Sequence, residues 1–265
     1  MSLNLKSDER HFVVKLAETE DELRAAQRLR YRVFVEELGA SGPTVDHDRQ
    51  LETDDFDAIY DHLLLIDNRC DHDAPERVAG VYRLLHSDVA RANGGFYSAS
   101  EFDLSVLERS ERVLLELGRS CVGREYRGGM AMYLLWNALA DYVIGHKVEV
   151  MFGVASYHGC DAGAIAQSLS FLHQNHLAPP DSRVRARTPN RQEMALIPPR
   201  QIEQKLAMSQ TPALINAYLR LGGCVGDGAF IDYNFNTIDV CLMMDTERMS
   251  LRHKQAYTRR SEARS

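Results

Sequence analysis

Short apolar runs bounded by turn residues alternate with longer segments in which apolar residues recur at helical spacing. Runs of the first kind predict β-strands, since they are rich in branched and aromatic residues and too short for stable helices. The predicted strands cover residues 12–17, 62–67, 78–85, 113–122, 150–155, 229–232 and 239–244. The order of strands and helices is typical of a mixed α/β domain.

Three segments, 20–38, 131–144 and 211–221, have the apolar spacing of amphipathic helices. In the third, Thr211 and Pro212 predict an N-cap followed by proline at the first helical position, and Gly222 predicts the end. Residues 46–61 are acidic and 86–110 look irregular. Residues 160–210 form a long insertion that is partly helical and rich in arginine and proline. We expect one domain over 1–265 that carries this insertion.

Composition adds a charge pattern to this picture. The 265 residues are 45% hydrophobic and 26% charged, ordinary values for a globular protein, and the net charge is −7. Two segments, 181–200 and the tail at about 246–265, are nevertheless basic. They predict contact with an anionic partner, either an acidic carrier protein or a membrane surface, or else are a solvated loop and tail. We expect no nucleic-acid partner, because no basic face is interleaved with aromatic residues.

The sequence also bears on the compartment. It has no apolar run of about 18 residues, so we expect no membrane-spanning helix. The first residues are polar and do not resemble a secretory signal. The five cysteines are widely spaced and odd in number, which favours a reducing cytosol. We therefore expect a cytoplasmic protein, with peripheral contact to the inner membrane as a further expectation.

The strand at 113–122 and the turn after it carry the first candidate chemistry. Gly118 interrupts the strand, and a glycine inside a strand often marks a β-bulge. The turn that follows ends in Arg127, Gly128 and Gly129 directly before a helix. Glycines allow close backbone approach, and a helix N-terminus offers free N–H groups to phosphate, although a plain strand-to-helix turn would look the same.

This arrangement of bulged strand, Arg-Gly turn and helix resembles the GNAT acyltransferase superfamily. Met130 and Met132 stand where that superfamily has further glycines, which suits the single phosphate of carrier-protein phosphopantetheine better than coenzyme A. The string AYLRLG at 217–222 resembles the superfamily's helix ending in Tyr-x-x-x-Gly. The resemblance implies that Tyr218 protonates the leaving thiolate, and a phenol with a reference pKa of about 10 is a protonated donor at neutral pH. The alternative is a core aromatic residue.

A second series of motifs resembles the acyl-homoserine lactone synthases, which are related to GNAT enzymes. The residues that fall on that family's signature are Arg30, Phe34, Asp54, Asp57, Arg83, Glu116 and Arg119. Gly39-Ala40-Ser41 occupies the region where the family has a tryptophan, so its substrate pocket is not fully reproduced.

The chain resembles more closely the ornithine N-acyltransferases of ornithine-lipid synthesis, often labelled hemolysin-like. The resemblance covers about residues 25–250 and rests on the strings RYRVFVEE, GGFYSASEFDL, LELGRSCVGREYRGG, LLW, YLRLGG and AFIDYNFNTIDV. It implies a GNAT-like fold. It also implies transfer of a 3-hydroxyacyl group from acyl carrier protein, or from acyl-CoA, to the α-amine of ornithine, forming lyso-ornithine lipid. No permanently bound cofactor is expected.

Reaction chemistry gives these residues provisional roles. The acceptor amine must lose a proton, and Glu116 is placed to accept it directly or through water. The backbone N–H groups of Cys121 and Val122 are the candidate donors to the thioester oxygen. Asp54 and Asp57 suit the side-chain ammonium of ornithine. Arg30, Arg83 or Arg119 suit its carboxylate, because guanidinium binds carboxylate in a planar fork. Buried ion pairs that hold loops are the alternative for each charged residue.

Other interpretations stay open at this point. Cys121 is a conceivable nucleophile, although a small buried strand residue fits as well. Histidine and cysteine residues near 158–161 and 173–176 do not complete a recognised ligand set, so no metal site is expected. An acyl-homoserine lactone synthase, an enzyme that acylates another amino acid such as glutamine, and a non-catalytic lipid-binding, carrier-binding or membrane-lytic protein remain as alternatives.

Overall fold

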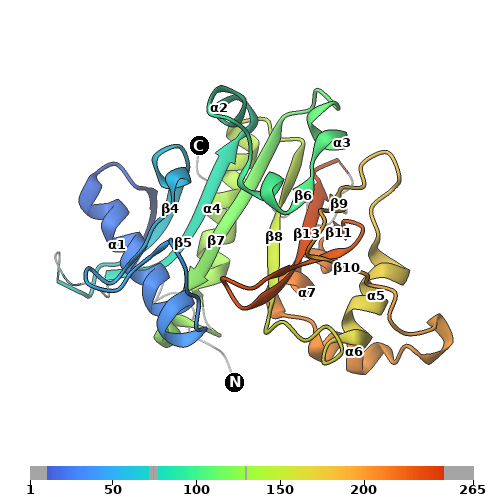
Figure 1. The fold of residues 1–265 in the computed structure, drawn as a ribbon. Coiled ribbons are helices and arrows are strands. Elements are labelled where there is room, and N and C mark those ends of the chain that lie inside the picture. Colours follow the sequence, from blue (N-terminus) through green and yellow to red (C-terminus); the bar gives the residue numbers. More distant parts are fainter. Residues whose placement is uncertain (1–10, 72–73, 75–76, 129, 248–265) are drawn as a thin grey trace, which may run out of the picture. The chain divides into compact units, whose positions relative to one another are not determined.

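The computed structural model describes residues 11–71, 74, 77–128 and 130–247 (Figure 1). Its contacts divide the chain into two compact units, each built from two separate stretches. Unit 1 comprises Met1–Leu85 and Leu117–His146, and unit 2 comprises His86–Glu116 and Lys147–Ser265. Strand β7 (Leu114–Val122) therefore contributes its first three residues to unit 2 and the rest to unit 1. The expectation of a single domain stays a prediction.

Unit 1 is a sheet in the order β1-β4-β5-β7, with β1–β4 and β4–β5 antiparallel. A two-stranded hairpin of β2 and β3 leads into a short 3₁₀-helix before β4. The elements of this unit besides β7 are β1 (Phe12–Leu16), α1 (Glu20–Arg30), π-helix η2 (Tyr31–Glu37), β2 (Val45–Asp46), β3 (Leu51–Glu52), η3 (Asp55–Ala58), β4 (Asp61–Asp67), β5 (Val78–His86), η6 (Arg124–Tyr126) and α4 (Ala131–Gly145).

Helix α1 begins where the sequence predicts it. The Thr19 side chain accepts a hydrogen bond from the Glu22 backbone N–H, which satisfies one of the free donors at the helix start. Ala26 and Leu29 are fully buried and pack in a cluster with strand residues such as Leu64. The predicted helix over 20–38 is correct in extent, but its last turns, 31–37, are a π-helix, a form that often lies at functional sites.

Helix α4 packs closely on the unit 1 sheet at Gly80. A Cβ atom at this position would lie 2.9 Å from the Leu135 side chain of α4, and Leu135 is fully buried. A side chain here would therefore force Leu135 or the helix to shift.

Unit 2 contains the other half of the strand order, β7-β8-β13-β12-β10, with β11 beside β13. Leu114–Glu116 of β7 pair in parallel with Val150–Phe152 of β8, and β8 pairs antiparallel with β13 over nine residues. Its further elements are α2 (Ser87–Ala92), η5 (Tyr97–Ser100), β6 (Phe102–Asp103), α3 (Ser105–Glu108), β8 (Val150–His158), α5 (Ala166–His176), β9 (Arg185–Ala186), β10 (Arg191–Gln192), η7 (Pro199–Gln201), α6 (Gln204–Gln210), α7 (Ala213–Arg220), β11 (Cys224–Val225), β12 (Ala229–Asp232) and β13 (Thr237–Asp245).

Two sequence predictions are wrong in unit 2. Residues 86–110, expected to be irregular, contain the short helices α2, η5 and α3. Thr211 does not cap the helix that follows it. Its hydroxyl donates to the Ala207 carbonyl oxygen at 2.8 Å, so it closes the end of α6, and Pro212 is the N-cap of α7. The Ser168 hydroxyl lies 2.5 Å from the Thr211 hydroxyl oxygen, a tertiary contact that the local sequence does not reveal.

Some predictions fall on residues that the structure does not describe. Gly129 is one of them, and so is the basic tail from residue 248 onward. Within the described ranges, every helix is too short or too polar to cross a lipid bilayer.

Candidate active site

Unit 1 contains a closed ring of alternating charges, hereafter the charged ring. Its members are Arg30, Glu52, Arg119, Asp54, Arg83 and Asp57. Arg30, at the end of α1, donates from Nε to Glu52 Oε2 and from Nη1 to Asp57 Oδ1, each at 2.5 Å. These short contacts are charge-assisted hydrogen bonds, the strongest kind in proteins.

Arg83 and Arg119 close the ring from the two neighbouring strands β5 and β7. Arg83 Nη1 lies 2.6 Å from Asp54 Oδ1 and 2.8 Å from Asp57 Oδ1. Arg119 donates from Nε to Glu52 at 3.2 Å and from Nη2 to Asp54 at 3.1 Å. Each arginine therefore bridges two carboxylates, and each carboxylate bridges two arginines.

Local capping places two of these carboxylates side by side. Asp54 is the N-cap of η3, and its Oδ1 accepts from the Phe56 backbone N–H at 3.1 Å. The Asp54 backbone N–H in turn faces Asp57 Oδ2 at 3.4 Å, which completes a capping box. The Asp-Asp-Phe-Asp string thus turns both carboxylates toward the arginines.

Burial makes this pairing obligatory. Arg30, Arg83 and Glu52 are 0% exposed, and an isolated buried charge would cost several kcal/mol. Burial alone would raise the pKa of Asp57, but Arg30 and Arg83 outweigh it and hold the pKa below the usual value. Burial likewise opposes the charge of Arg30, and Glu52 and Asp57 raise its pKa above the ordinary range. Asp57 and Arg30 are therefore both charged at neutral pH.

The ring contains five of the residues that the sequence singled out, Arg30, Asp54, Asp57, Arg83 and Arg119. It also contains Glu52, which sequence reasoning missed. The available signal was its position two residues before Asp54 in the acidic segment. Nothing in the segment distinguishes this carboxylate from its exposed neighbours until the fold is known.

Phe34 lies in the π-helix η2 and is partly buried. It packs against the apolar cluster of Ala26, Leu29 and Val33 with the strands β4 and β5. Its predicted substrate contact stays a prediction, while its packing role is visible in the contacts of the cluster.

The backbone of β7 is interrupted, but one residue later than predicted. Arg119 has φ +48°, in the left-handed region, whereas Gly118 does not. This conformation costs a non-glycine residue about 1–2 kcal/mol, so it requires support from its surroundings. The Arg119 guanidinium is held by two carboxylates, those of Glu52 and Asp54.

Cys121 and Val122 follow the interruption and are both buried. Burial raises the pKa of the Cys121 thiol to about 12. A thiol with this pKa is protonated at neutral pH and is a poor nucleophile. The geometry therefore favours the interpretation of Cys121 as a small core residue over that of an acyl-enzyme nucleophile.

The turn between β7 and α4 is tied to the unit by side-chain contacts. Arg127 donates from Nε to the Val122 carbonyl oxygen at 3.0 Å and pairs with Glu37 at 2.7 Å. Gly128 has φ +73°, which only glycine adopts without strain. Tyr126 donates its hydroxyl to Asp67 at 3.1 Å. The turn is thus held from both sides, and part of the Arg127 side chain remains exposed.

Glu116 lies in the unit 2 part of β7 and is almost fully buried. Its two carboxylate oxygens accept from the backbone N–H groups of Tyr97 at 2.9 Å and Ser98 at 2.6 Å. These bonds fix the carboxylate at the start of η5.

Tyr218 is buried in α7, near the end of the helix. Its carbonyl oxygen accepts from the N–H groups of Leu221 at 3.0 Å and Gly223 at 2.9 Å. A Cβ atom on Gly223 would lie 2.8 Å from that oxygen, so the turn requires glycine. Packing thus accounts for Gly223 independently of any catalytic role of Tyr218.

The arginine-rich insertion uses most of its arginines internally. Arg183 donates to the Ala178 carbonyl oxygen at 2.7 Å, and Arg187 donates to that of Ala99 at 2.8 Å. The Arg185 side chain is 71% exposed and lies 3.6 Å from Asp227. Arg185 is therefore better placed to meet a partner than Arg183 or Arg187.

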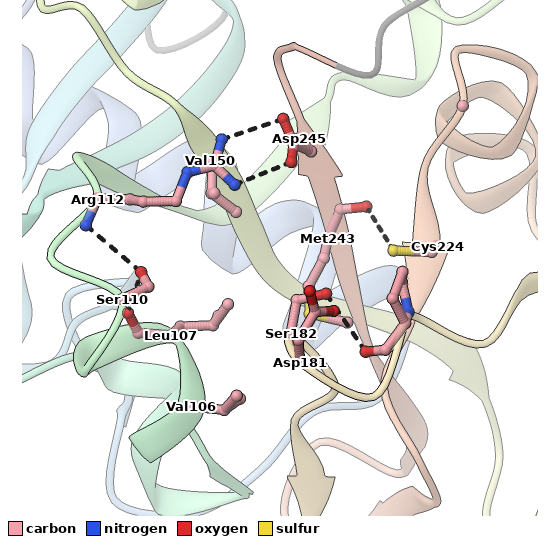
Figure 2. Close-up of a pocket in the computed structure, with 12 residues that line it drawn as sticks. Val106, Leu107, Ser110, Arg112, Val150, Asp181, Ser182, Cys224, Met243 and Asp245 are labelled. Atoms are coloured by element: carbon pink, nitrogen blue, oxygen red, sulfur yellow. Dashed lines mark hydrogen bonds and ion pairs between the residues drawn. The ribbon is translucent and has the colours of Figure 1, made fainter.

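Unit 2 also contains a cavity of about 240 Å³ at the start of β8 and the end of β13 (Figure 2). Leu107 of α3, Val150 and Met243 give it an apolar wall. Arg112 and Asp245 line it as well, and form a two-pronged ion pair with distances of 2.8 and 3.1 Å. The cavity therefore combines apolar surface with a charged edge.

Among the described residues, one group of carboxylates is arranged as cation ligands would be. The oxygens of Glu101, Asp232 and Asp239 lie within 4.8 Å of one another, and Glu101 and Asp239 are buried. Carboxylate oxygens suit hard cations. Acidic groups of this kind are common without an ion, and the expectation of no metal site stays a prediction.

Comparisons with known proteins agree on the class of enzyme. A family model described as an acetyltransferase (GNAT) domain matches residues 29–137. The chain is 53% identical over 253 residues to the L-ornithine N(alpha)-acyltransferase of Rhodobacter capsulatus, which covers 96% of this chain and 97% of that protein. It is 44% identical over 246 residues to the protein of the same name from Brucella abortus, covering 92% of this chain and 88% of that one.

A solved structure shares the fold. The structure of FeeM, an N-acyl amino acid synthase from uncultured soil microbes, superimposes with a TM-score of 0.51 at 10% identity, covering 89% of this chain and 92% of that one. At this identity the likeness concerns the fold alone.

Proposed function

Because this chain belongs to the family of the L-ornithine N(alpha)-acyltransferases, with the fold of GNAT enzymes, we propose that it acylates the α-amine of ornithine with a fatty acyl group carried on acyl carrier protein. The observation that carries the proposal is the 53% identity over 96% of the chain. The product is an N-acyl ornithine, the lyso form of an ornithine lipid. Acyl-CoA is the alternative donor, since it presents the same thioester.

The reaction is a direct transfer. The nitrogen lone pair attacks the thioester carbonyl, a C–N bond forms, and the C–S bond breaks. The acceptor nitrogen loses one proton, and the departing thiolate gains one. In the proposal Glu116 accepts the first and Tyr218 donates the second. Support for Glu116 comes from its carboxylate, which two backbone N–H groups hold in a fixed orientation, and support for Tyr218 from the family string in which it stands.

The thioester oxygen develops negative charge during attack. The backbone N–H groups of Cys121 and Val122 are the proposed donors to it, because they follow the left-handed Arg119 at which β7 leaves regular strand geometry. Preorganised backbone donors of this kind contribute a few kcal/mol to transition-state stabilisation.

The phosphate of phosphopantetheine is proposed to bind at the turn of Arg127, Gly128 and Gly129. The left-handed Gly128 allows close backbone approach, and the exposed part of the Arg127 guanidinium supplies positive charge. Because Glu37 pairs with Arg127, we expect a single phosphate to be held more readily than a pyrophosphate. Together with Met130 and Met132, which stand where the GNAT superfamily has further glycines, this supports the carrier protein as donor.

Ornithine is proposed to bind at the charged ring, with Phe34 as a further contact. Asp54 and Asp57 would balance the side-chain ammonium, and Arg30, Arg83 or Arg119 the carboxylate. The side chains of Asp54 and Arg119 are each 9% exposed, more than the other ring members. The edge of the ring that these two form is therefore the part best suited to contact a substrate.

Peripheral contact with an anionic membrane is a further part of the proposal. The acylated product is amphiphilic, and the tail at about 246–265 is basic. Most of that tail lies outside the described residues.

The decisive experiment incubates the purified protein with 3-hydroxyacyl carrier protein and a panel of amino acids, and identifies acyl amides by mass spectrometry. We expect N-acyl ornithine as the main product, and slower transfer from acyl-CoA. A lactone formed from S-adenosylmethionine would instead identify an acyl-homoserine lactone synthase. Acylation of glutamine in preference to ornithine would overturn the acceptor assignment.

A further inference from the structure

Glu52 is the one member of the charged ring to which the proposed function gives no role. It ends strand β3 and is fully buried. Its Oε2 accepts from Arg30 Nε at 2.5 Å, and its backbone carbonyl oxygen accepts from Arg30 Nη2 at 2.7 Å. Both its main chain and its side chain are therefore fixed to the same guanidinium.

Arg30 is itself immobile. It is fully buried at the end of α1, where Nη1 donates to Asp57 Oδ1 at 2.5 Å and Nη2 also donates to Asp57 Oδ2 at 3.1 Å. The second oxygen of Glu52 is thus presented from a rigid support that includes α1, β3 and η3. That oxygen faces Arg119 Nε at 3.2 Å.

Arg119 needs such a support because its backbone is in a conformation that arginine disfavours. Its φ of +48° is the point at which β7 leaves regular geometry. Without an anchor on the side chain, the residue would gain free energy by returning to the extended region. The two peptide groups that it joins would then rotate, and the N–H groups that follow would change direction.

We propose that Glu52 is a positioning residue that holds Arg119 in its left-handed conformation and thereby aims the backbone of residues 118–122 at the thioester. The inference rests on the proposed function for the nature of the reaction. Glu52 acts only through Arg119 and does not touch the substrate. Asp54 contributes the second anchor on Arg119 at 3.1 Å.

A merely structural role for Glu52 makes different predictions. If the ring only holds the unit together, its loss lowers the melting temperature, while kcat of the folded protein is unchanged. If Glu52 aims the backbone, kcat at saturating substrates falls even in protein that is fully folded. A displacement of about 1 Å at a reacting centre lowers a rate by about 100-fold.

The experiment compares Arg119→Gly, Arg119→Ala, Glu52→Gln and the double variant Glu52→Gln/Arg119→Gly. Glycine accepts the left-handed conformation without an anchor, whereas alanine does not. We therefore expect kcat to fall in the order wild type, Arg119→Gly, Arg119→Ala, with the last about 100-fold below wild type. Glu52→Gln should lower kcat by at least about ten-fold in the wild-type background but not further in the Arg119→Gly background.

Equal kcat for Arg119→Gly and Arg119→Ala would overturn the proposal, as would an equal effect of Glu52→Gln in both backgrounds. If the Glu52→Gln variant does not fold, two comparisons still test the proposal. These are Arg119→Gly against Arg119→Ala, and Arg119→Gly against the double variant, in which one negative and one positive charge are removed together. Amide hydrogen exchange of residues 118–122 gives a readout without turnover. We expect faster exchange in Arg119→Ala than in wild type, even if no acyl transfer to ornithine is found, whereas unchanged exchange would contradict the positioning role.

Discussion

At the scale of single residues, burial and hydrogen bonding decide which side chains are suited to chemistry. Cys121 has a nucleophilic atom, but burial raises the pKa of its thiol to about 12 and keeps it protonated. Glu116 is also buried, and its carboxylate oxygens accept hydrogen bonds from two backbone N–H groups. Burial therefore favours a packing role for Cys121, while the proton-accepting role of Glu116 stays a proposal.

The first prediction concerns Glu116. Replacing it with glutamine removes the proton acceptor and should lower kcat for acyl transfer about 100-fold or more, since general bases contribute about 10²–10⁴-fold. Steady-state assays with ornithine would measure this effect. Glu108→Gln, at an exposed position of the nearby helix α3, is the matched control and should retain wild-type kcat. Full activity of Glu116→Gln in folded protein would rule out the assignment.

The second prediction concerns acid stability. The arginines of the charged ring lower the pKa of Asp54 and Asp57 in the folded protein, although burial opposes them. Groups with a lowered folded pKa contribute stability that is fully present above the unfolded pKa of about 3.9 and is lost as the pH falls toward the folded pKa. Urea unfolding should therefore give a free energy of unfolding that drops below about pH 4. A free energy that stays constant from pH 5 to pH 3 would contradict the pairing.

At the scale of elements, close packing between helix and strand sets the geometry of unit 1. Helix α4 directly follows the turn that is proposed to bind phosphate. Its packing on the sheet therefore determines where its N-terminus lies. Helix α4 packs on the sheet through the buried Leu135, which lies against Gly80 of β5. The position of the proposed phosphate site therefore depends on a contact far from it in the sequence.

The third prediction tests this contact between Gly80 and Leu135. Gly80→Ala places a Cβ atom 2.9 Å from Leu135 and should destabilise the protein by about 1–3 kcal/mol, the usual cost of overpacking. It should also raise KM for the acyl donor, because α4 is displaced. Gly145→Ala is the matched control at the end of the same helix, with nothing within 4 Å of its Cβ, and should leave stability unchanged or increase it. Thermal and denaturant unfolding would compare the two, and equal stability would refute the packing argument.

At the scale of the whole molecule, charge is distributed unevenly along an acidic chain. The net charge of −7 would repel an acidic carrier protein unless a local basic surface outweighs it. In the arginine-rich insertion, Arg183 and Arg187 are engaged with backbone carbonyl groups, so charge there is partly used for loop structure. Arg185 remains as an exposed positive group.

The fourth prediction follows for the carrier protein. Arg185→Glu should raise KM for acyl carrier protein several-fold, most strongly at low salt, and leave KM for the corresponding acyl-CoA unchanged. Arg24→Glu, at an exposed position of α1, serves as the control variant. An unchanged KM for the carrier-linked donor would contradict a role of Arg185 in binding the carrier protein.

The limits of sequence reasoning are visible at particular residues. Thr211 and Pro212 have the pattern of a helix start, yet the Thr211 hydroxyl closes the preceding helix and lies beside that of Ser168, 43 residues away. Gly118 is the residue that favours a bulge, yet it is Arg119 that takes the left-handed conformation, and the carboxylates of Glu52 and Asp54 hold its side chain. In both cases a tertiary contact outweighs a local preference.

The amino-acid sequence by itself determined the strands and the main helices of the fold, because period and turn residues are local properties. Motifs that recur in fixed order also identified the family. Five of the six members of the charged ring were named from the sequence as candidate substrate-binding residues. Only the tertiary structure decided that these members close into a ring through Glu52. It alone located the interruption of β7 at Arg119 and assigned the insertion arginines to loops. These features depend on which distant groups meet in a buried, weakly screened environment, where pairing of charges is obligatory and local propensity is secondary.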